Sequence, residues 1–296
     1  MNDSQPSYHL AIDGGGTSCR FALQTPGGGF TVRRGSANVS SDFQAAVAVL
    51  NDGISELISQ ADLDADRLRD IPIYAGLAGV VDGSVAQAVA DQLPSRYVQI
   101  EDDRRSAVVG ALGAQSGSLL GIGTGSFLAR QSDGEIRFIG GYGSDLGDEA
   151  SGCWLGKRLL QRALHVLDGV EPTSDLIESC LAEFQHDVAQ IVKFSFRSRP
   201  VDFGAYAPRI VQAAQASDPF GRELMQAGAE YICKGLSALG FVPGEAVCPI
   251  GGVAAFYVDY LPRDVAANVV SGQGAALDGA LELAHRFAQQ IEQERA

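Results

Sequence analysis

Hydrophobic and polar residues follow two patterns along the chain, and the first pattern occurs twice. Within Tyr8–Arg34, three short apolar runs are separated by glycine-rich turns, and Leu119–Ile139 repeats this order of runs and turns. Short apolar runs bounded by Gly or Asp-Gly turns are typical of β-hairpins. The sequence therefore predicts one β-β-β unit used twice, with the two copies starting about 110 residues apart.

The second pattern is helical. Apolar residues within Phe43–Ala61 return every three or four positions and fall on one face of a helix. Two apolar runs, Ile71–Ala75 and Tyr97–Ile100, predict strands on either side of a helix over Ser84–Leu93. This strand–helix–strand order implies parallel pairing through a right-handed crossover.

The later part of the chain is mostly helical. Helical spacing predominates from Asp148 to about Gly240, and the run Glu245–Ile250 predicts a late strand. A last helix carries apolar residues on one face from Leu277 to Ile291. The chain is therefore expected to combine two small sheets with flanking helices.

Length and this order of elements together predict two lobes. Domains usually contain about 100–200 residues, and the chain has 296. We place the passage between the lobes near a helix over Arg104–Gly113. The expected N-terminal lobe comprises residues 1–105 and 279–296, and the C-terminal lobe comprises residues 106–278.

Charge and cysteine content exclude several classes of protein. The 22 Lys and Arg residues stand against 36 Asp and Glu residues, for a net charge of −14. Such a surface repels nucleic acid and anionic membranes, so neither is an expected partner. The five cysteines form no CxxC, which argues against a zinc site or a disulfide framework and favours the reducing cytoplasm. Met1–Ser7 lacks a basic leader, and no apolar run reaches the ~18 residues of a membrane span.

The first chemical signal is the turn that follows the first apolar run. Asp13 precedes Gly14, Gly15 and Gly16, and Thr17 follows them. Glycines allow the backbone to approach a ligand closely, and consecutive N–H groups in such a turn can hold an anion. Asp13 is a candidate ligand for Mg²⁺, and Thr17 offers a hydroxyl group to phosphate. The alternative is an ordinary glycine-rich hairpin.

The second signal is the corresponding turn of the second β-β-β copy. It contains Gly123, Thr124, Gly125 and Ser126. Alone it is a weak motif, but two such turns, one from each lobe, would hold a polyphosphate from both sides of a cleft. The chain has no GxxxxGK[ST] motif, so such a clamp would need no lysine.

The third signal is a pair of aspartates, Asp102 and Asp103, between a strand and a helix. Phosphoryl transfer to a hydroxyl group uses a carboxylate to orient the hydroxyl and accept its proton. Either residue is placed for that role, but either is also a good helix N-cap. Spacing alone leaves the choice open.

Two further glycine-rich segments are weaker signals. The loop Gly140–Gly152 ends where a helix begins, so Asp148 and Ser151 are candidate caps and Asp148 is equally a candidate sugar ligand. Gly251 and Gly252 follow the late strand, where exposed backbone would let an adenine ring approach. An ordinary turn is the alternative at Gly251 and Gly252.

Taken together, the motifs resemble the ATPase superfamily of sugar kinases, heat-shock ATPases and actin. Within it the chain resembles the N-acetylglucosamine kinase group, whose wider family includes the activator ATPases of benzoyl-CoA reductase. Residues 187–208 are similar to bacterial glucosamine-specific kinases. The segments that carry the likeness are DGGGTSCR (13–20), GSAN (35–38), GLAG (76–79), GTGS (123–126) and GGYGSDLGDEAS (140–151).

The resemblance implies an α/β fold of two ribonuclease H-like lobes, each a mixed five-stranded sheet flanked by helices, around an ATP cleft. The N-terminal lobe then carries the sugar and first-phosphate side, and the C-terminal lobe the second-phosphate and adenosine side. Asp103 aligns with the catalytic base, and Asn38, Gly141 and Asp148 with sugar-binding positions. The family usually has Trp at Tyr142 and Gly at Ala150, and both departures lie in the loop that the resemblance assigns to the sugar.

The implied activity is transfer of the γ-phosphate of ATP, with Mg²⁺, to the 6-hydroxyl of glucosamine or N-acetylglucosamine. Glu149 or Asp145 is a candidate to read a free amine at C2. An activator ATPase for a partner reductase or dehydratase is the alternative, and it would need cysteines that hold an iron–sulfur cluster. A sugar-sensing regulator is disfavoured because no DNA-binding module is evident. The sequence does not fix an oligomeric state and is compatible with a homodimer.

Overall fold

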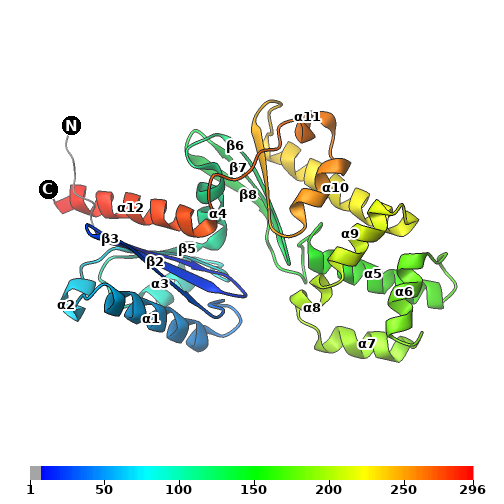
Figure 1. Ribbon diagram of the computed structural model, residues 1–296, viewed down its shortest axis with the longest axis horizontal. Coiled ribbons are helices and arrows are strands. Elements are labelled where there is room, and N and C mark those ends of the chain that lie inside the picture. The colour runs from blue at the N-terminus through cyan, green and yellow to red at the C-terminus, as the bar shows by residue number, and fades with distance from the viewer. Residues whose placement is uncertain (1–7, 296) are drawn as a thin grey trace. The chain divides into compact units, whose positions relative to one another are not determined.

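The computed structural model describes residues 8–295, so the prediction made for Met1–Ser7 lies outside the described residues. The chain divides into two compact units. Unit 1 comprises Met1–Ala114 and Gly272–Ala296, and unit 2 comprises Gln115–Ser271. Each unit holds a mixed sheet with helices packed against it, as the α/β prediction required (Figure 1).

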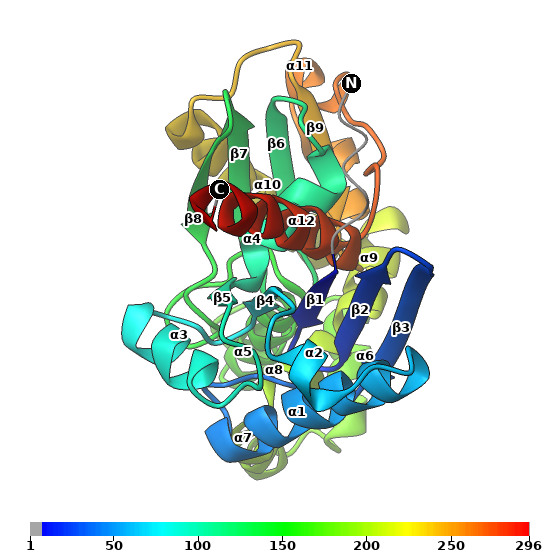
Figure 2. The same ribbon diagram turned by 90° about the vertical axis from the view of Figure 1, so that its left-hand side faces the viewer.

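The sheet of unit 1 has five strands in the order β3-β2-β1-β4-β5 (Figure 2). The first three strands pair antiparallel, and β4 and β5 continue the sheet in parallel from β1. This confirms the first predicted β-β-β unit and the predicted parallel crossover. The strand bounds are β1 His9–Gly14, β2 Cys19–Thr25, β3 Gly28–Arg34, β4 Ile73–Leu77 and β5 Val98–Asp102.

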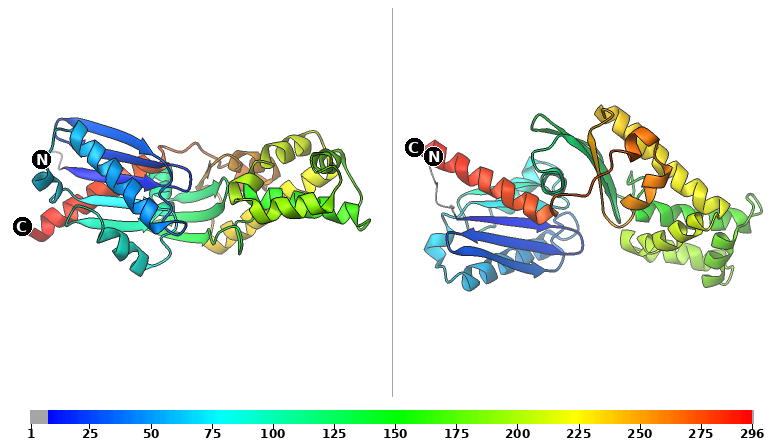
Figure 3. Two further views of the ribbon diagram at one scale, coloured as in Figure 1. Left: turned by 90° about the horizontal axis from the view of Figure 1, so that it is seen from below. Right: turned by 45° about the horizontal axis from the view of Figure 1, so that its top comes forward.

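Helices cover both faces of this sheet. On one face lie α1 (Phe43–Gln60), the short α2 (Ala65–Leu68) and α3 (Gly83–Ala90), with α1 running across the strands (Figure 3). The predicted apolar face of α1 is buried in the core of unit 1. On the opposite face lie α4 (Asp103–Leu112) and the C-terminal helix α12 (Ala276–Arg295). Two glycines permit close contact between α4 and α12. A Cβ on Gly110 would collide with the Ala275 carbonyl, and a Cβ on Gly279 would collide with the Ser106 carbonyl.

This packing bears on the predicted lobe boundaries. Helix α4 lies wholly in unit 1, whereas the sequence placed the passage between lobes at residues 105 and 106. The structure divides after Ala114 and again before Gly272, rather than at residues 278 and 279. The reason is the contact between α4 and α12, which keeps both helices on the sheet of unit 1.

The sheet of unit 2 has four strands in the order β8-β7-β6-β9. Strands β6 to β8 form the second predicted β-β-β copy, and β9 pairs in parallel with β6. A fifth strand, expected from the family resemblance, is reduced to an isolated bridge between Val247 and Val269, because only one residue pair meets the ladder geometry there. The strand bounds are β6 Gly117–Ile122, β7 Ser126–Ser132, β8 Glu135–Gly140 and β9 Ala246–Ile250.

The remainder of unit 2 is helical, as predicted. Helix α10 packs against β7 and β8, and the 3₁₀ helix η1 packs against β9. The other helices assemble around α5, with Phe203 and Tyr206 among their buried side chains. In residues 8–295 no helix is both long and apolar enough to span a membrane. The bounds are α5 Gly152–Leu167, α6 Asp175–Glu183, α7 Val188–Arg197, α8 Pro200–Gly204, α9 Ala207–Gln215, α10 Pro219–Leu239, η1 Ala254–Tyr260 and α11 Arg263–Ala266.

Candidate active site

The first glycine turn joins β1 to β2 in unit 1. Asp13 lies one residue before the end of β1 and is buried, with 5% of the residue exposed. The Gly15 amide donates to the Ser18 carbonyl over 3.0 Å, which closes the turn and leaves Gly16 and Thr17 exposed. No atom lies within 4 Å of a Cβ built on Gly16, so the turn is open where a ligand would approach its backbone.

Asp13 is paired with Arg20, a residue that the sequence analysis did not consider. In the antiparallel register of β1 and β2, Arg20 stands opposite Asp13, and its guanidinium contacts the Asp13 carboxylate. Burial raises the pKa of Asp13, and the positive charge of Arg20 opposes that rise. The hairpin register was the available signal, because residues that pair directly across a hairpin project to the same face of the sheet.

The two candidate aspartates have different roles in the fold. Asp102 is the N-cap of α4, since its carboxylate accepts from the Arg104 amide at 2.9 Å and also pairs with the Arg104 side chain. Asp103 is the first residue of α4 and is therefore free of the capping role. Burial, followed by the nearby charges of Asp102 and Asp13, raises the pKa of Asp103 to about 7.

Asp13 and Asp103 lie at one edge of the same sheet. In the parallel ladder, Asp13 pairs with Gly76 of β4, and the next residue, Leu77, pairs with Asp102 of β5. The carboxyl ends of β1 and β5 therefore reach this edge together, with β4 between them. A Cβ on Gly76 would lie 3.3 Å from the Cα atom of Asp103, so glycine allows the start of α4 to pack closely over β4.

Asn38 lies beside the first turn, in the GSAN segment. The backbone of this segment is bound to its neighbours, because the Ala37 amide donates to the Gly15 carbonyl and the Val39 amide to the Ala78 carbonyl. Within its own turn, Asn38 Oδ1 accepts from the backbone amides of Ser40 and Ser41. These contacts fix the side chain with its Nδ2 group available for a ligand.

The second glycine turn, Gly123–Ser126, joins β6 to β7 in unit 2. The Gly123 amide donates to the Gly125 carbonyl over 2.9 Å. The Gly123 and Thr124 carbonyls accept from the first amides of α5, those of Gly152 and Cys153. The start of α5 is therefore attached directly to this turn.

Asp148 closes against the same turn. Its side chain is buried, and a Cβ on Gly125 would lie 2.7 Å from Asp148 Oδ2. Burial raises the pKa of Asp148, and hydrogen bonds from the backbone amides of Ser126 and Gly143 oppose that rise. The cap of α5 is Ser151, which accepts from the Trp154 amide at 3.0 Å, so Asp148 is not the helix cap.

The loop that carries Asp148 has a strained backbone and an exposed tip. Asp148 and Ala150 have φ of 61° and 67°, in the left-handed region. Glycine adopts this left-handed conformation without strain, which explains why glycine would suit the position of Ala150. Gly141 also has a positive φ, 75°, and it is exposed beside Tyr142, whose side chain is 71% exposed.

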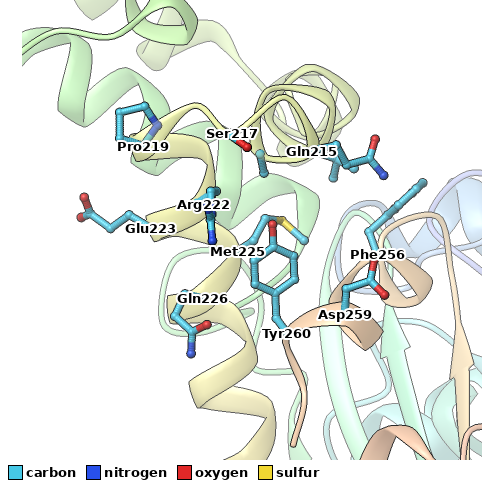
Figure 4. Close-up of a pocket in the computed structure, with 12 residues that line it drawn as sticks. Gln215, Ser217, Pro219, Arg222, Glu223, Met225, Gln226, Phe256, Asp259 and Tyr260 are labelled. Atoms are coloured by element: carbon cyan, nitrogen blue, oxygen red, sulfur yellow. The ribbon is translucent and has the colours of Figure 1, made fainter.

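Gly251 and Gly252 follow β9 and lie next to the second turn. Gly251 has a φ of 91°, and a Cβ there would collide with the Ile122 carbonyl. The 3₁₀ helix η1 starts two residues after Gly252 and lines one side of a cavity of about 810 Å³ (Figure 4). Phe256, Asp259 and Tyr260 of η1 and Arg222 of α10 are among its lining residues.

The structure thus brings the predicted residues together in two sets. Unit 1 holds Asp13, the turn Gly14–Thr17, Asn38 and Asp103. Unit 2 holds the turn Gly123–Ser126, Gly141, Asp148, Gly251 and Gly252. The sugar positions implied by the family resemblance are therefore divided between the units, with Asn38 in one and Gly141 and Asp148 in the other.

All five cysteines are free. Cys19 lies opposite Gly14 at the first turn, and the Cys153 amide donates to Thr124 at the second, so each set has one cysteine beside it. Within residues 8–295, no group of three or more His, Cys, Asp or Glu side chains has a metal-binding arrangement.

Two known proteins are similar to this chain over most of its length. A glucosamine kinase, GspK, of Vibrio cholerae is 31% identical over 281 residues, which cover 94% of this chain and 96% of that protein. The crystal structure of a protein assigned as an N-acetylglucosamine kinase from Chromobacterium violaceum matches with a TM-score of 0.80 and 29% identity, over 93% of this chain and 98% of that one.

A more distant structure shows the fold alone. The glucokinase of the ROK family from Streptomyces griseus, solved with glucose and an ATP analogue, has a TM-score of 0.55 and 17% identity, over 95% of this chain and all of that chain. Residues 10–279 match the sequence pattern of one protein family. The chain belongs to the BadF/BadG/BcrA/BcrD ATPase family.

Proposed function

We propose that this protein is an ATP-dependent amino-sugar kinase that phosphorylates the 6-hydroxyl of glucosamine or N-acetylglucosamine. The observation that carries the proposal is Asp103, a carboxyl group with a pKa raised to about 7 at the edge that also holds Asp13 and the first glycine turn. A strongly perturbed carboxyl group beside an anion-binding turn is typical of an active site. The likeness to a glucosamine kinase over 94% of the chain supports the acceptor class.

In this proposal the two glycine turns bind the phosphates of ATP. The open backbone at Gly16, and the equally open position at Gly123, allow close approach of phosphate oxygens to amide groups. The adenine ring would lie at Gly251 and Gly252 and enter the cavity beside η1, where Phe256 offers an aromatic face. Because one turn belongs to each unit, the proposal requires the two units to close around the nucleotide.

The residues present fit Mg²⁺. Magnesium is usually held by one or two carboxylates together with substrate phosphates and water, rather than by a cage of protein ligands. Asp13, buried at the edge of the first turn, supplies a hard oxygen ligand of this kind. Bound there, Mg²⁺ would neutralise part of the phosphate charge.

Asp103 would act as the general base. The sugar hydroxyl attacks the γ-phosphorus, the new O–P bond forms, and the bond from that phosphorus to the β–γ bridging oxygen breaks to release ADP. The hydroxyl proton passes to the Asp103 carboxylate. A pKa of about 7 suits this role, because a large fraction of the group is ionised near neutral pH and the carboxylate is still basic enough to take the proton.

The sugar would be held by residues from both units. Asn38 offers an amide group from unit 1, while Asp148 and the Gly141 backbone offer acceptors and donors from unit 2. Glu149 and Asp145 flank Asp148 in the loop and are the candidates to bind a free amine at C2. The free cysteines fit a reducing compartment, and we place the enzyme in the cytoplasm.

A coupled ADP-release assay over four acceptors tests the proposal. Glucosamine, N-acetylglucosamine, glucose and N-acetylmannosamine are compared at equal concentration with ATP and Mg²⁺. We expect one of the two glucosamine compounds to give the highest kcat/KM. ADP release that is the same with and without every sugar would reject the kinase.

A further inference from the structure

Lys157 of α5 is a cation beside the loop Gly140–Gly152 to which the proposed function gives no role. Its Nζ atom donates to the Ser144 carbonyl at 2.6 Å and lies 3.6 Å from Asp145 Oδ1. The same ammonium group lies 5.5 Å from the centroid of the Phe203 ring in α8, within reach of a cation–π interaction. Lys157 therefore connects the loop to two helices of unit 2.

The second half of this loop is held by contacts that do not involve Lys157. The Ser126 hydroxyl, at the start of β7, donates to the Glu149 carbonyl at 2.6 Å. The Tyr257 hydroxyl, in η1, donates to the Ala150 carbonyl at 2.8 Å. These bonds fix the second half on the rest of unit 2 and would remain if the Lys157 ammonium were removed.

The first half of the loop is packed less closely. The side chains of Tyr142, Asp145 and Leu146 are largely exposed. A cavity of about 650 Å³ lies beside this part of the loop, lined by Ser144 and Lys157 together with residues of α5, α7 and α8. Because side chains do not fill that space, the hydrogen bond from Lys157 to Ser144 supplies support that packing does not.

The carbonyl that Lys157 holds is close in sequence to the proposed sugar-binding groups. Ser144 follows Gly143, whose backbone amide donates to the Asp148 carboxylate. Burial raises the pKa of Asp148, and the positive charge of Lys157 is among the effects that oppose this rise. Gly141 and Gly143 have φ of 75° and 85°, and glycine adopts many other backbone conformations as readily. An external contact is therefore needed to select one conformation of this segment.

We propose that Lys157 is a positioning residue, which holds the segment Gly141–Ser144 in the conformation that binds the sugar. The inference rests on the proposed function, because it assigns Lys157 to the sugar side of the same site. An ammonium group has three donors, so it can bind the Ser144 carbonyl and the Asp145 carboxylate together. Lys157 acts through Gly141 and Asp148 rather than on the reacting atoms.

Three single variants and one double variant test this role. Lys157→Met removes the ammonium and keeps most of the side-chain stem, whereas Lys157→Arg keeps the charge and the donors. Arg158→Met is the matched control, because Arg158 is the next residue of α5, is exposed and donates to Gln161 of the same helix. The double variant combines Lys157→Met with Asp148→Asn.

The first measurement is hydrogen–deuterium exchange of the full chain without ligands, followed by mass spectrometry. Lys157→Met should raise the exchange rate of the Gly143 and Gly147 amides, which donate to Asp148 and to the Gly143 carbonyl, by about tenfold. Exchange of residues 149–152 should change by less than about twofold. Equal exchange of Gly143 and Gly147 in Lys157→Met and Arg158→Met would overturn the inference. A uniform rise across unit 2 would do so as well, because Lys157 would then support folding in general.

The second measurement is the coupled ADP-release assay with the better of the two glucosamine compounds. Lys157→Met should raise the KM for the sugar about tenfold, the effect of a lost charge-assisted hydrogen bond, and leave the KM for ATP within about twofold. Lys157→Arg should recover most of this loss, and Arg158→Met should stay within about twofold of the wild type. The double variant should raise the sugar KM by less than the product of the two separate factors, because both changes act on one contact network.

Two kinetic results would contradict the positioning role. One is an equal rise in KM for sugar and ATP, and the other is a double variant whose sugar KM equals that product. A wild-type protein that phosphorylates neither sugar would reject the proposed function instead. The exchange measurement would still decide whether Lys157 holds the loop, so the two failures are distinguishable.

Discussion

The first hairpin of each β-β-β unit, β1–β2 in unit 1 and β6–β7 in unit 2, has the same backbone plan, but the two differ in the charged groups around the turn. In unit 1, the buried carboxylate of Asp13 belongs to the strand before the turn and is paired with a cationic side chain, Arg20. In unit 2, the buried carboxylate of Asp148 comes from a distant loop and is bound by backbone amides beside the Gly125 turn. A repeated β-β-β unit thus supplies two similar glycine turns with different electrostatic surroundings.

This difference indicates that the two units have different chemical roles. The unit 1 edge gathers three carboxylates, Asp13, Asp102 and Asp103, and the mutual repulsion of these charges helps to raise the pKa of Asp103. The unit 2 turn carries a single buried carboxylate and the start of α5. In the proposed mechanism, proton transfer and metal binding therefore belong to unit 1, while both units contribute residues that bind the nucleotide and the sugar.

The largest expected effect is that of Asp103→Asn. It should lower kcat by about a hundredfold or more while ADP and sugar affinities stay within a few fold, because only the base is lost. The matched control is Asp102→Asn, since asparagine is as good an N-cap as aspartate. The measurement is kcat in a coupled ADP-release assay. Near-normal turnover of Asp103→Asn would contradict the assignment of the general base to unit 1.

Asp148→Asn tests the role given to unit 2. It should raise the KM for the sugar by about tenfold or more, the cost of a lost charged hydrogen bond, and leave the KM for ATP within about twofold. Asp133→Asn is the control, because Asp133 is exposed on the turn between β7 and β8 and has no role in the proposed sugar site. Equal sugar KM values for the two variants would show that Asp148 only supports the Gly125 turn.

The pH dependence of kcat/KM tests the role of Asp103 in unit 1. Asp103 must be ionised to act as a base, so kcat/KM should fall about tenfold per pH unit below its pKa of about 7. Its contribution to folding stability has the opposite sign. Because the folded-state pKa is raised from 3.8, folding disfavours the charged form, and stability from this group declines as pH rises from about 4 to 7. The profile is measured with saturating ATP, and activity that is flat from pH 5 to 8 would contradict it.

The smallest expected effect concerns the helix contact that holds α4 in unit 1. Gly110→Ala should lower the free energy of unfolding by about 1–3 kcal/mol, because the added methyl group meets the Ala275 carbonyl. Gly83→Ala is the control, since no atom lies within 4 Å of a Cβ there. Chemical denaturation compares the two. Equal stability would mean that α4 and α12 can separate without cost.

Periodicity was sufficient for most of the fold. The two hairpins, α1 and the parallel strands were predicted because their apolar patterns depend on local sequence alone. The division of the chain after Ala114 was not predicted from the sequence, because it depends on a contact between α4 and α12, which are about 160 residues apart. The fifth strand of unit 2 was expected by analogy and is only a bridge at Val269.

For the candidate site, the sequence indicated glycines and acids but left their partners open. Spacing left the choice between Asp102 and Asp103 open, and only the family resemblance favoured Asp103; the structure adds a physical difference, because Asp102 is the N-cap of α4. Arg20 was missed because its significance comes from strand register rather than from a motif. The left-handed backbone at Ala150 was equally hidden, because alanine gives no local sign of a positive φ.

The most direct test of the central claim is to identify where the phosphate goes. ³¹P NMR of a reaction with ATP, Mg²⁺ and glucosamine or N-acetylglucosamine distinguishes a sugar phosphate ester from inorganic phosphate. The account predicts, for at least one of the two sugars, one equivalent of ester per ADP, with the phosphorus signal split by the protons at C6. Inorganic phosphate as the product with both sugars would contradict the kinase and favour an ATPase that serves a partner protein.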